Sequence, residues 1–207
     1  MKRLTTREQL ESEIKRLIVL EPRFGAVHEK HGTPSLRGAD ANLETLLMIV
    51  TEQFLSLKAA AAIWQRLAEA LGPISSETIL AHTPERLMQL GLSGSKAKCF
   101  HACAAARLDF ATAPEDLRKR LLEIWGIGPW TADIFMLSAI GHADAWPAGD
   151  LALQAATQNL LSLKARPNTR KMEEIATAWQ PHRATAARLL WAHYRGLNGL
   201  KQAPSQN

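Results

Sequence analysis

Helix start and stop signals divide almost the whole chain into short segments, and no stretch alternates apolar and polar residues as a half-buried strand would. Thr6 followed by Gln9 predicts a capping box, and Thr83 before Pro84 predicts an N-cap with proline at the first helical position. Further helices are expected over about 41–54, 56–71, 95–108, 114–126 and 129–140, and from about residues 150, 169 and 181 onward, whereas residues 23–38 are expected to form a loop. The chain is therefore predicted to be all-α, with roughly ten helices and short connections.

Composition places the chain among globular proteins. Its 207 residues, 46% of them apolar, fit one domain or two small ones that share an interface. No apolar run approaches the roughly 18 residues that a membrane span needs, and the charged N-terminal segment predicts no signal peptide. The two cysteines cannot supply a disulfide scaffold or the four thiolates of an iron–sulfur cluster. We therefore expect a reduced, soluble, cytoplasmic protein.

Positive charge is concentrated in the C-terminal quarter of the chain. From Leu151 onward, eight lysines and arginines stand against two glutamates, a net charge of +6, whereas residues 1–150 carry −1. Such a concentration favours a polyanionic partner, most simply nucleic acid. A solvated basic surface explains the charge equally well, so charge alone does not decide.

The most specific segment is the short turn from Gly126 to Gly128 between two expected helices, followed by Pro129, Trp130 and Thr131. Glycines let a phosphate approach the main chain closely, and the N-terminus of the second helix offers free N–H groups and a favourable dipole. A helix-hairpin-helix element holds the DNA backbone in this way without reading bases. The alternative is an ordinary tight helix–helix turn with glycine as the C-cap. The apolar residues before the turn and the Pro-Trp-Thr-Ala run after it favour the DNA interpretation.

Asp150 follows a loop that contains Pro147 and Gly149, and it opens an expected helix. Taken alone, an aspartate in this place predicts an N-cap. Its position after the hairpin makes a capping role alone less favoured.

Smaller signals concern cysteine, histidine and basic residues. The spacing of Cys99, His101 and Cys103 is similar to that of a metal site, but residues two apart face different sides of a helix, so burial is the expected role. Three basic side chains near expected helix starts are predicted phosphate contacts, with plain surface positions as the alternative: Lys96, His182 and Arg183.

Together these motifs resemble the helix-hairpin-helix DNA glycosylase superfamily, and in particular its alkylation-repair branch, the DNA-3-methyladenine glycosylases II. The resemblance extends over about 36–199. Besides the hairpin and Asp150, it rests on three segments: Glu52-Gln53-Phe54-Leu55-Ser56, which matches a Gln-Gln-x-x-Ser motif with Glu52 in place of the first glutamine; Gly91-Leu92-Ser93 with Lys96; and Trp179-Gln180-Pro181-His182-Arg183 ahead of Trp191.

The resemblance implies a role for each candidate site residue. Asp150 would be the catalytic carboxylate, and Phe54 would fill the gap left by an extruded base. The base pocket would be lined by Trp130, Trp191, Ile134 and Leu151. DNA contacts would come from Gln53, Phe54, Leu55, Lys96, Gly126, Ile127, Gly128, Thr131, His182 and Arg183. For Trp179, core packing is the expected role.

The chemistry of alkylated purines agrees with a single carboxylate. An N3- or N7-alkylated purine is already cationic, so it departs without a general acid, and a carboxylate stabilises the oxocarbenium-like transition state. Indole faces attract a cationic base. In related glycosylase/lyases a lysine occupies the position of Trp130 and attacks the sugar. We therefore expect a monofunctional enzyme that leaves an abasic site without cutting the strand.

The resemblance also implies an all-α, two-lobed fold with the active-site cleft between the lobes. Residues 43–150 would form the central lobe with the hairpin at about 114–140, residues 1–42 would pack with the basic C-terminal lobe 151–199, and 200–207 would be a frayed tail. We expect a monomer that binds double-stranded DNA with a damaged base and no membrane. No metal site or cofactor is expected beyond a monovalent cation on the main-chain carbonyls of Leu122, Ile124 and Ile127.

Two other functions fit the same sequence. A non-catalytic helix-hairpin-helix module would bind DNA without releasing a base, with an affinity that depends on salt. A glycosylase of the same fold for oxidised, deaminated or mismatched bases would need leaving-group protonation, so its activity would depend more strongly on pH.

Overall fold

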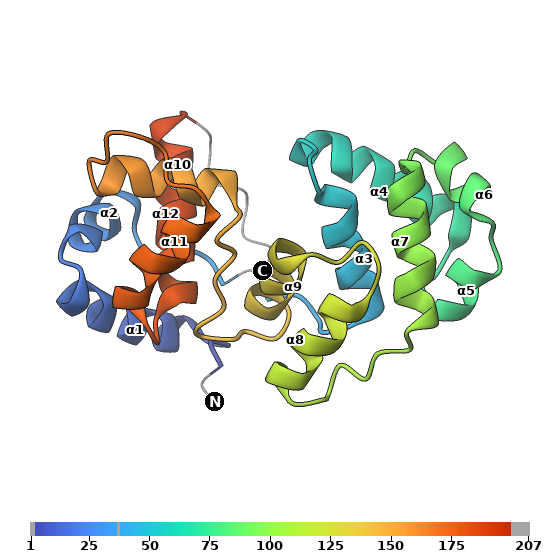
Figure 1. Ribbon diagram of the computed structural model, residues 1–207, viewed down its shortest axis with the longest axis horizontal. Helices are drawn as coiled ribbons and strands as arrows, with labels where there is room; N and C mark the ends of the chain where they lie inside the picture. The colour runs from blue at the N-terminus through green and yellow to red at the C-terminus, as the bar shows by residue number, and fades with distance from the viewer. Residues whose placement is uncertain (1–2, 37, 200–207) are drawn as a thin grey trace. The chain divides into compact units, whose positions relative to one another are not determined.

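The computed structural model describes residues 3–36 and 38–199, and within these ranges it contains no β-strand, which confirms the all-α class. The frayed tail expected at 200–207 lies outside the described residues. One isolated bridge pairs Arg3 with His142. The helices are α1 (Arg7–Leu20), α2 (Arg23–His31), α3 (Leu43–Glu52), α4 (Leu57–Leu71), α5 (Ser76–Leu80), α6 (Pro84–Gln89), α7 (Gly94–Ala105), α8 (Pro114–Glu123), α9 (Pro129–Ser138), α10 (Leu151–Leu160), α11 (Thr169–Ala176), the 3₁₀ helix η1 (Thr177–Trp179) and α12 (Arg183–Leu197) (Figure 1).

Side-chain caps start many of these helices. The predicted capping box of α1 is confirmed: the Thr6 hydroxyl accepts the Gln9 N–H at 3.3 Å, and the Gln9 side-chain oxygen accepts the Thr6 N–H at 3.2 Å. Thr83 caps α6 with Pro84 at its first position, as predicted. The caps satisfy N–H groups that have no partner within a helix. No helix in the described part of the chain is long and apolar enough to cross a membrane.

The prediction of a loop over 23–38 is wrong, because residues 23–31 form α2. Phe24 and Val27 stand three residues apart on one face of this helix, and both are buried. Packing does not require glycine at position 25, because a β carbon there would make an ordinary van der Waals contact, 3.7 Å from the Ile18 side chain. Burial of an apolar face therefore outweighs the loop signals of glycine and proline. The short helix α5 was not expected either.

The chain divides into two compact units, Ala39–Phe135 (the inserted unit) and Met1–Gly38 together with Met136–Asn207 (the terminal unit). The predicted central lobe, 43–150, thus extends too far toward the C-terminus. Residues 136–150 belong to the terminal unit because they bond to its other elements: the Leu4 N–H donates to the Gly141 carbonyl at 2.7 Å, and the Ala184 N–H donates to the Ala143 carbonyl at 3.1 Å. The active-site cleft expected between two lobes stays a prediction.

The inserted unit is built around α7, which packs against α3, α5 and α6. Its core is formed by fully buried side chains: Leu46, Leu47, Val50, Leu67, Phe100 and Leu117. Cys99 and Cys103 are both buried on α7 with their sulfur atoms 3.9 Å apart, as expected for structural cysteines.

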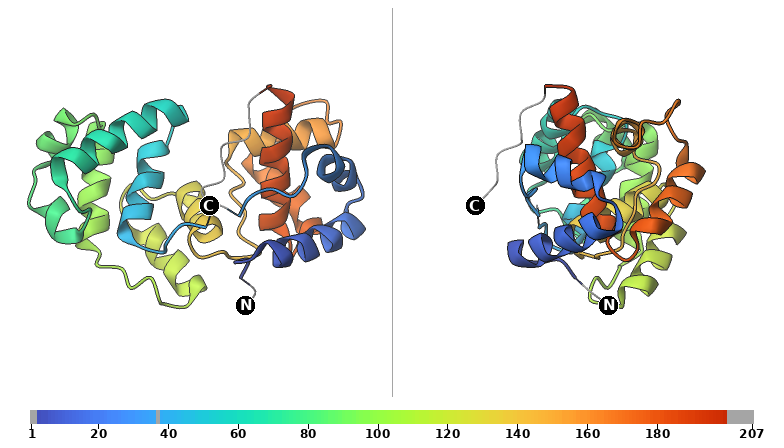
Figure 2. Two further views of the ribbon diagram at one scale, coloured as in Figure 1. Left: turned by 180° about the vertical axis from the view of Figure 1, so that it is seen from behind. Right: turned by 90° about the vertical axis from the view of Figure 1, so that its left-hand side faces the viewer.

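The terminal unit is built around α12, which packs against α10, α2 and α1 (Figures 1 and 2). Trp179 is buried here, with its ring centroid 5.3 Å from that of Phe24 and 5.5 Å from that of Trp146, which confirms its expected place in the core. Arg188 of α12 is also buried, and its guanidinium donates to the main-chain carbonyls of Leu36 and Leu137. These carbonyls lie near the two points at which the chain passes between the units.

Candidate functional site

The turn between α8 and α9 requires glycine at one position for two independent reasons. Gly126 has a φ of +88°, and a β carbon placed on it would lie 2.8 Å from both the Cβ and the Sγ of Cys99. Ile124 and Ile127 are buried on either side, and the Ile127 N–H donates to the Ile124 carbonyl at 3.0 Å. The buried side chains of Ile124 and Ile127 hold the turn on the core, whereas the Trp125 side chain between them is 56% exposed.

The first turn of α9 offers main-chain N–H groups that have no partner within the helix. Gly128 precedes this turn, and nothing lies within 4 Å of the place where its β carbon would be. An anion can therefore approach the main chain closely here, at the positive end of the helix dipole. Thr131 can contact an anion only through its main-chain N–H group, because its side chain is buried.

The carbonyls expected to hold a monovalent cation fit such an ion. Those of Leu122 and Ile124 lie at the C-terminal end of α8, where a helix leaves carbonyl groups without partners and carries partial negative charge. The Ile124 carbonyl accepts one hydrogen bond, from Ile127, and a carbonyl oxygen has a second lone pair.

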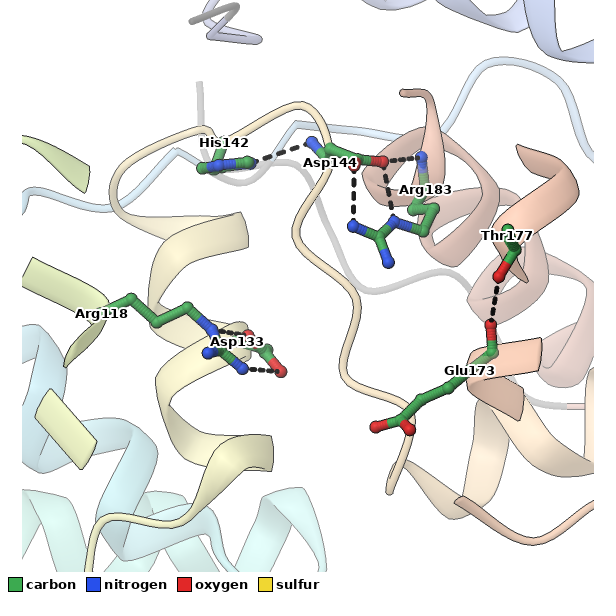
Figure 3. Close-up of polar contacts among 7 residues, drawn as sticks. All are labelled: Arg118, Asp133, His142, Asp144, Glu173, Thr177 and Arg183. Atoms are coloured by element: carbon green, nitrogen blue, oxygen red, sulfur yellow. Dashed lines mark hydrogen bonds and ion pairs between the residues drawn. The ribbon is translucent and has the colours of Figure 1, made fainter. Parts of the chain in front are cut away.

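An ion pair joins the two helices of the hairpin, and the sequence analysis did not predict it. The Arg118 guanidinium on α8 donates to both carboxylate oxygens of Asp133 on α9, at 2.7 and 3.2 Å (Figure 3). Asp133 is buried, and a carboxylate within the mainly apolar sequence of α9 was the signal that could have indicated the pair.

Phe54 occupies an unusual turn directly after α3. Its φ is +57° and its side chain is fully exposed, and Leu55 beside it is 40% exposed. The left-handed conformation costs a non-glycine residue about 1–2 kcal/mol. Packing within the protein does not repay this cost, because the ring is exposed. A strained, exposed aromatic residue is a candidate for contact with a ligand.

Two side chains fasten the turn that carries Phe54. The Gln53 amide donates to the Thr131 hydroxyl at 2.7 Å. The Lys96 ammonium donates to the main-chain carbonyls of Thr51 at 2.8 Å and Gln53 at 2.7 Å, and burial lowers the pKa of this lysine. The phosphate contact predicted for Lys96 stays a prediction, and in the structure its ammonium holds this turn. The sequence could not show this, because its partners are main-chain atoms more than 40 residues away.

Trp130 and Ile134 lie four residues apart on α9, and both are half-buried. Residues at this spacing share a helix face. The two predicted pocket residues of the inserted unit are thus neighbours on one face.

Asp150 is the N-cap of α10 and also holds a tryptophan. Its Oδ1 atom accepts the Leu153 N–H at 2.9 Å and the indole N–H of Trp191 at 3.2 Å. The structure therefore brings the predicted catalytic carboxylate and one predicted pocket residue into direct contact within the terminal unit. Leu151, next to Asp150, is 61% exposed.

His182 and Arg183 are not presented as phosphate contacts in this structure. His182 is buried, and its Nδ1 atom bonds to the Glu13 carboxylate at 2.5 Å. Arg183 donates to both oxygens of Asp144, at 2.8 and 2.7 Å, and the Asp144 N–H donates to the His142 ring (Figure 3). Both basic side chains at the start of α12 are thus used to join elements of the terminal unit.

Comparison with known proteins identifies the family. The chain belongs to the HhH-GPD superfamily of base excision DNA repair proteins, which matches residues 47–181. It is 27% identical over 186 residues to YfjP of Bacillus subtilis and 28% identical over 116 residues to the alkylbase DNA glycosidase-like protein mag2 of Schizosaccharomyces pombe. These alignments cover 81% and 52% of this chain but only 64% and 54% of the relatives, so the chain spans less than two thirds of either.

A solved structure shows the same fold. The DNA-3-methyladenine glycosidase of Bacillus halodurans matches with a TM-score of 0.75 and 27% identity, over 92% of this chain and 93% of that one. The helices described above are therefore those of a helix-hairpin-helix glycosylase fold.

Proposed function

We propose that this protein is a monofunctional DNA glycosylase that hydrolyses the N-glycosidic bond of alkylated purines, such as 3-methyladenine and 7-methylguanine, in duplex DNA. The observation that carries the proposal is the Asp150 carboxylate, fixed at the start of α10 by the Leu153 N–H and by the indole of Trp191. The names of the relatives support the substrate class.

The proposed reaction uses Asp150 twice. As the bond from the sugar to the base breaks, its electron pair neutralises the cationic purine, and the carboxylate stabilises the positive charge that develops on the sugar. Water then bonds to the sugar carbon and gives its proton to Asp150. The bonds from Leu153 and Trp191 fix the carboxylate before the reaction, so no ordering is needed in the transition state.

DNA binding would come from main-chain groups and from Phe54. The N–H groups at the start of α9 would hold a phosphate, and a monovalent cation on the carbonyls of Leu122, Ile124 and Ile127 would add a second contact to the backbone. Phe54 would occupy the space vacated by the extruded base, which offsets part of the unstacking cost of a few kcal/mol. The protein would act as a monomer on double-stranded DNA.

The side chain at position 130 supports a reaction without strand cleavage. Trp130 stands where a lyase needs an amine that attacks the sugar, and an indole cannot form a Schiff base. The product would therefore be an abasic site in an intact strand.

The test is release of free methylated bases from methylated duplex DNA, with abasic sites and strand breaks scored in parallel. We expect methylpurines from the wild type with intact strands, and none from Asp150→Asn. Asparagine caps a helix as well as aspartate does, so we expect this variant to keep the fold of α10. Excision by Asp150→Asn at the wild-type rate would remove the catalytic assignment. Tight DNA binding by the wild type without release would favour a binding module.

A further inference from the structure

Phe54 needs restraints that its own side chain cannot supply. The ring is fully exposed and the backbone is left-handed, so neither packing nor intrinsic preference holds the residue in place. The restraints must act on the main chain and on the neighbouring side chains.

Lys96 supplies the first restraint. Its ammonium donates to two carbonyls at the C-terminal end of α3, those of Thr51 and Gln53. Helix C-termini carry partial negative charge and unpaired carbonyl groups, so a cation there is stabilising and its hydrogen bonds are charge-assisted.

The position of Lys96 on its own helix points to the same role. Ser93 is the N-cap of α7, which places Lys96 in the first turn, where the helix dipole disfavours a positive charge. Burial also lowers the pKa of its ammonium, so the surroundings of this lysine work against the charge. The charge-assisted hydrogen bonds to the two carbonyls, those of Thr51 and Gln53, offset part of these costs.

Gln53 supplies the second restraint. Its main-chain carbonyl is held by Lys96, and its side-chain amide donates to the hydroxyl of Thr131, which is buried in the first turn of α9. The residue before Phe54 is thus fixed at both ends, once to α7 and once to the hairpin.

We propose that Lys96 is a positioning residue, which sets the turn of Phe54 in its inserting conformation before DNA binds. Acting through the turn, it would raise the rate of base extrusion and excision rather than the affinity for the DNA backbone. The inference rests on the proposed glycosylase function for its effect on excision, but the ordering of the turn is independent of that function.

Three variants separate this role from that of a phosphate contact. Lys96→Met keeps the alkyl chain and removes the donors, Lys96→Arg restores donors, and Lys98→Met removes an exposed positive charge two residues away on the same helix as a matched control. Urea unfolding of each variant verifies that the fold is retained.

The first measurement is hydrogen–deuterium exchange of peptides that cover residues 53–55 in the free protein. For Lys96→Met we expect exchange about 5-fold faster than in the wild type or Lys98→Met, because the turn opens more often. Fluorescence of 2-aminopurine opposite a tetrahydrofuran abasic site then reports insertion of Phe54. At saturating protein, the fluorescence change should be smaller for Lys96→Met than for the wild type, and Lys98→Met should behave as the wild type does.

The second measurement is single-turnover excision at saturating methylated DNA. Lys96→Met should be slower by about 10-fold or more, since small misplacements of positioning groups have effects of this size. Lys96→Arg should recover part of the rate, and the Kd for DNA should change no more than in Lys98→Met.

Two results would overturn the proposal. One is that Lys96→Met matches Lys98→Met in hydrogen exchange, in 2-aminopurine fluorescence and in excision rate. The other is unchanged exchange together with a loss of affinity and a salt slope reduced by about one, which would make Lys96 a phosphate contact. If the wild type releases no methylpurine, the proposed function fails, yet exchange and the abasic duplex still decide the role of Lys96.

Discussion

Replacing Gly126 with alanine should destabilise the protein strongly, whereas the same change at Gly128 should not. At Gly126 the new β carbon would meet the Cβ and Sγ of Cys99 at 2.8 Å, and the residue would be held at a φ of +88°. Overpacking costs about 1–3 kcal/mol, and a left-handed conformation about 1–2 kcal/mol, so the expected loss is about 2–5 kcal/mol. At Gly128 the β carbon meets nothing within 4 Å, so the loss should be about 1 kcal/mol or less.

Urea unfolding of the two variants measures this difference, and a double-mutant cycle divides it between contact and strain. Cys99→Ala removes the sulfur but leaves its Cβ in place, whereas Cys99→Gly removes both atoms. In the background of Gly126→Ala, Cys99→Gly should therefore show a larger favourable coupling energy than Cys99→Ala. Equal losses at Gly126 and Gly128, or a coupling energy near zero with Cys99, would refute the reasoning.

The affinity for DNA should fall in Gly128→Ala, the variant whose stability is expected to change little. A β carbon at Gly128 would stand between a phosphate and the main-chain N–H groups of α9, so Gly128→Ala should weaken DNA binding while unfolding almost as the wild type does. Electrophoretic mobility shifts at fixed salt would measure the affinity. An unchanged affinity would exclude this end of α9 as the phosphate site.

Three other predictions concern the terminal unit and the turn after α3. Burial, followed by neighbouring positive charges, lowers the pKa of both His31 and His193. The unfolded chain therefore binds more protons than the folded one, and the free energy of unfolding should fall as the pH decreases below about 6.5. A wild-type urea midpoint that does not change between pH 7.5 and 5, or an equal change with pH in a variant with glutamine at both positions, would contradict this. Phe54→Gly should slow excision and yet raise the free energy of unfolding by about 1 kcal/mol, because the relief of left-handed strain exceeds the backbone entropy that glycine adds to the unfolded chain. A loss of stability in urea unfolding would contradict the strain. Trp191→Phe removes the indole N–H from Asp150 and should lower kcat with little change in KM; a change confined to KM would assign Trp191 to base binding alone.

Helix starts were predictable from the sequence because their determinants are local. Thr6 with Gln9, and Thr83 with Pro84, lie within a few residues of the groups that they satisfy. At α2 the helix forms because burial of Phe24 outweighs the loop-forming tendency of the nearby glycine and proline. This burial depends on the rest of the fold, so the local sequence could not show it.

The boundary between the units was misplaced for a similar reason. It falls between Phe135 and Met136, inside the continuous helix α9, where no break in composition marks it. The partners within the candidate site were equally hidden, because Lys96 and Thr131 reach atoms 43 and 78 residues away. The sequence motifs predicted candidate site residues, but the hydrogen-bond partners of these residues depend on tertiary structure.

The buried guanidinium of Arg188, which holds Leu36 and Leu137, also has a consequence for biosynthesis. The inserted unit is continuous in sequence and is complete once residue 135 has been made. The terminal unit must wait for α12, which supplies Arg188 and the partner surface of α1 and α2. At about 5–20 residues per second, the apolar faces of these first two helices stay uncovered for about 8–30 s after their synthesis. Synthesis of the terminal unit therefore starts first, but the inserted unit is the first that can fold completely.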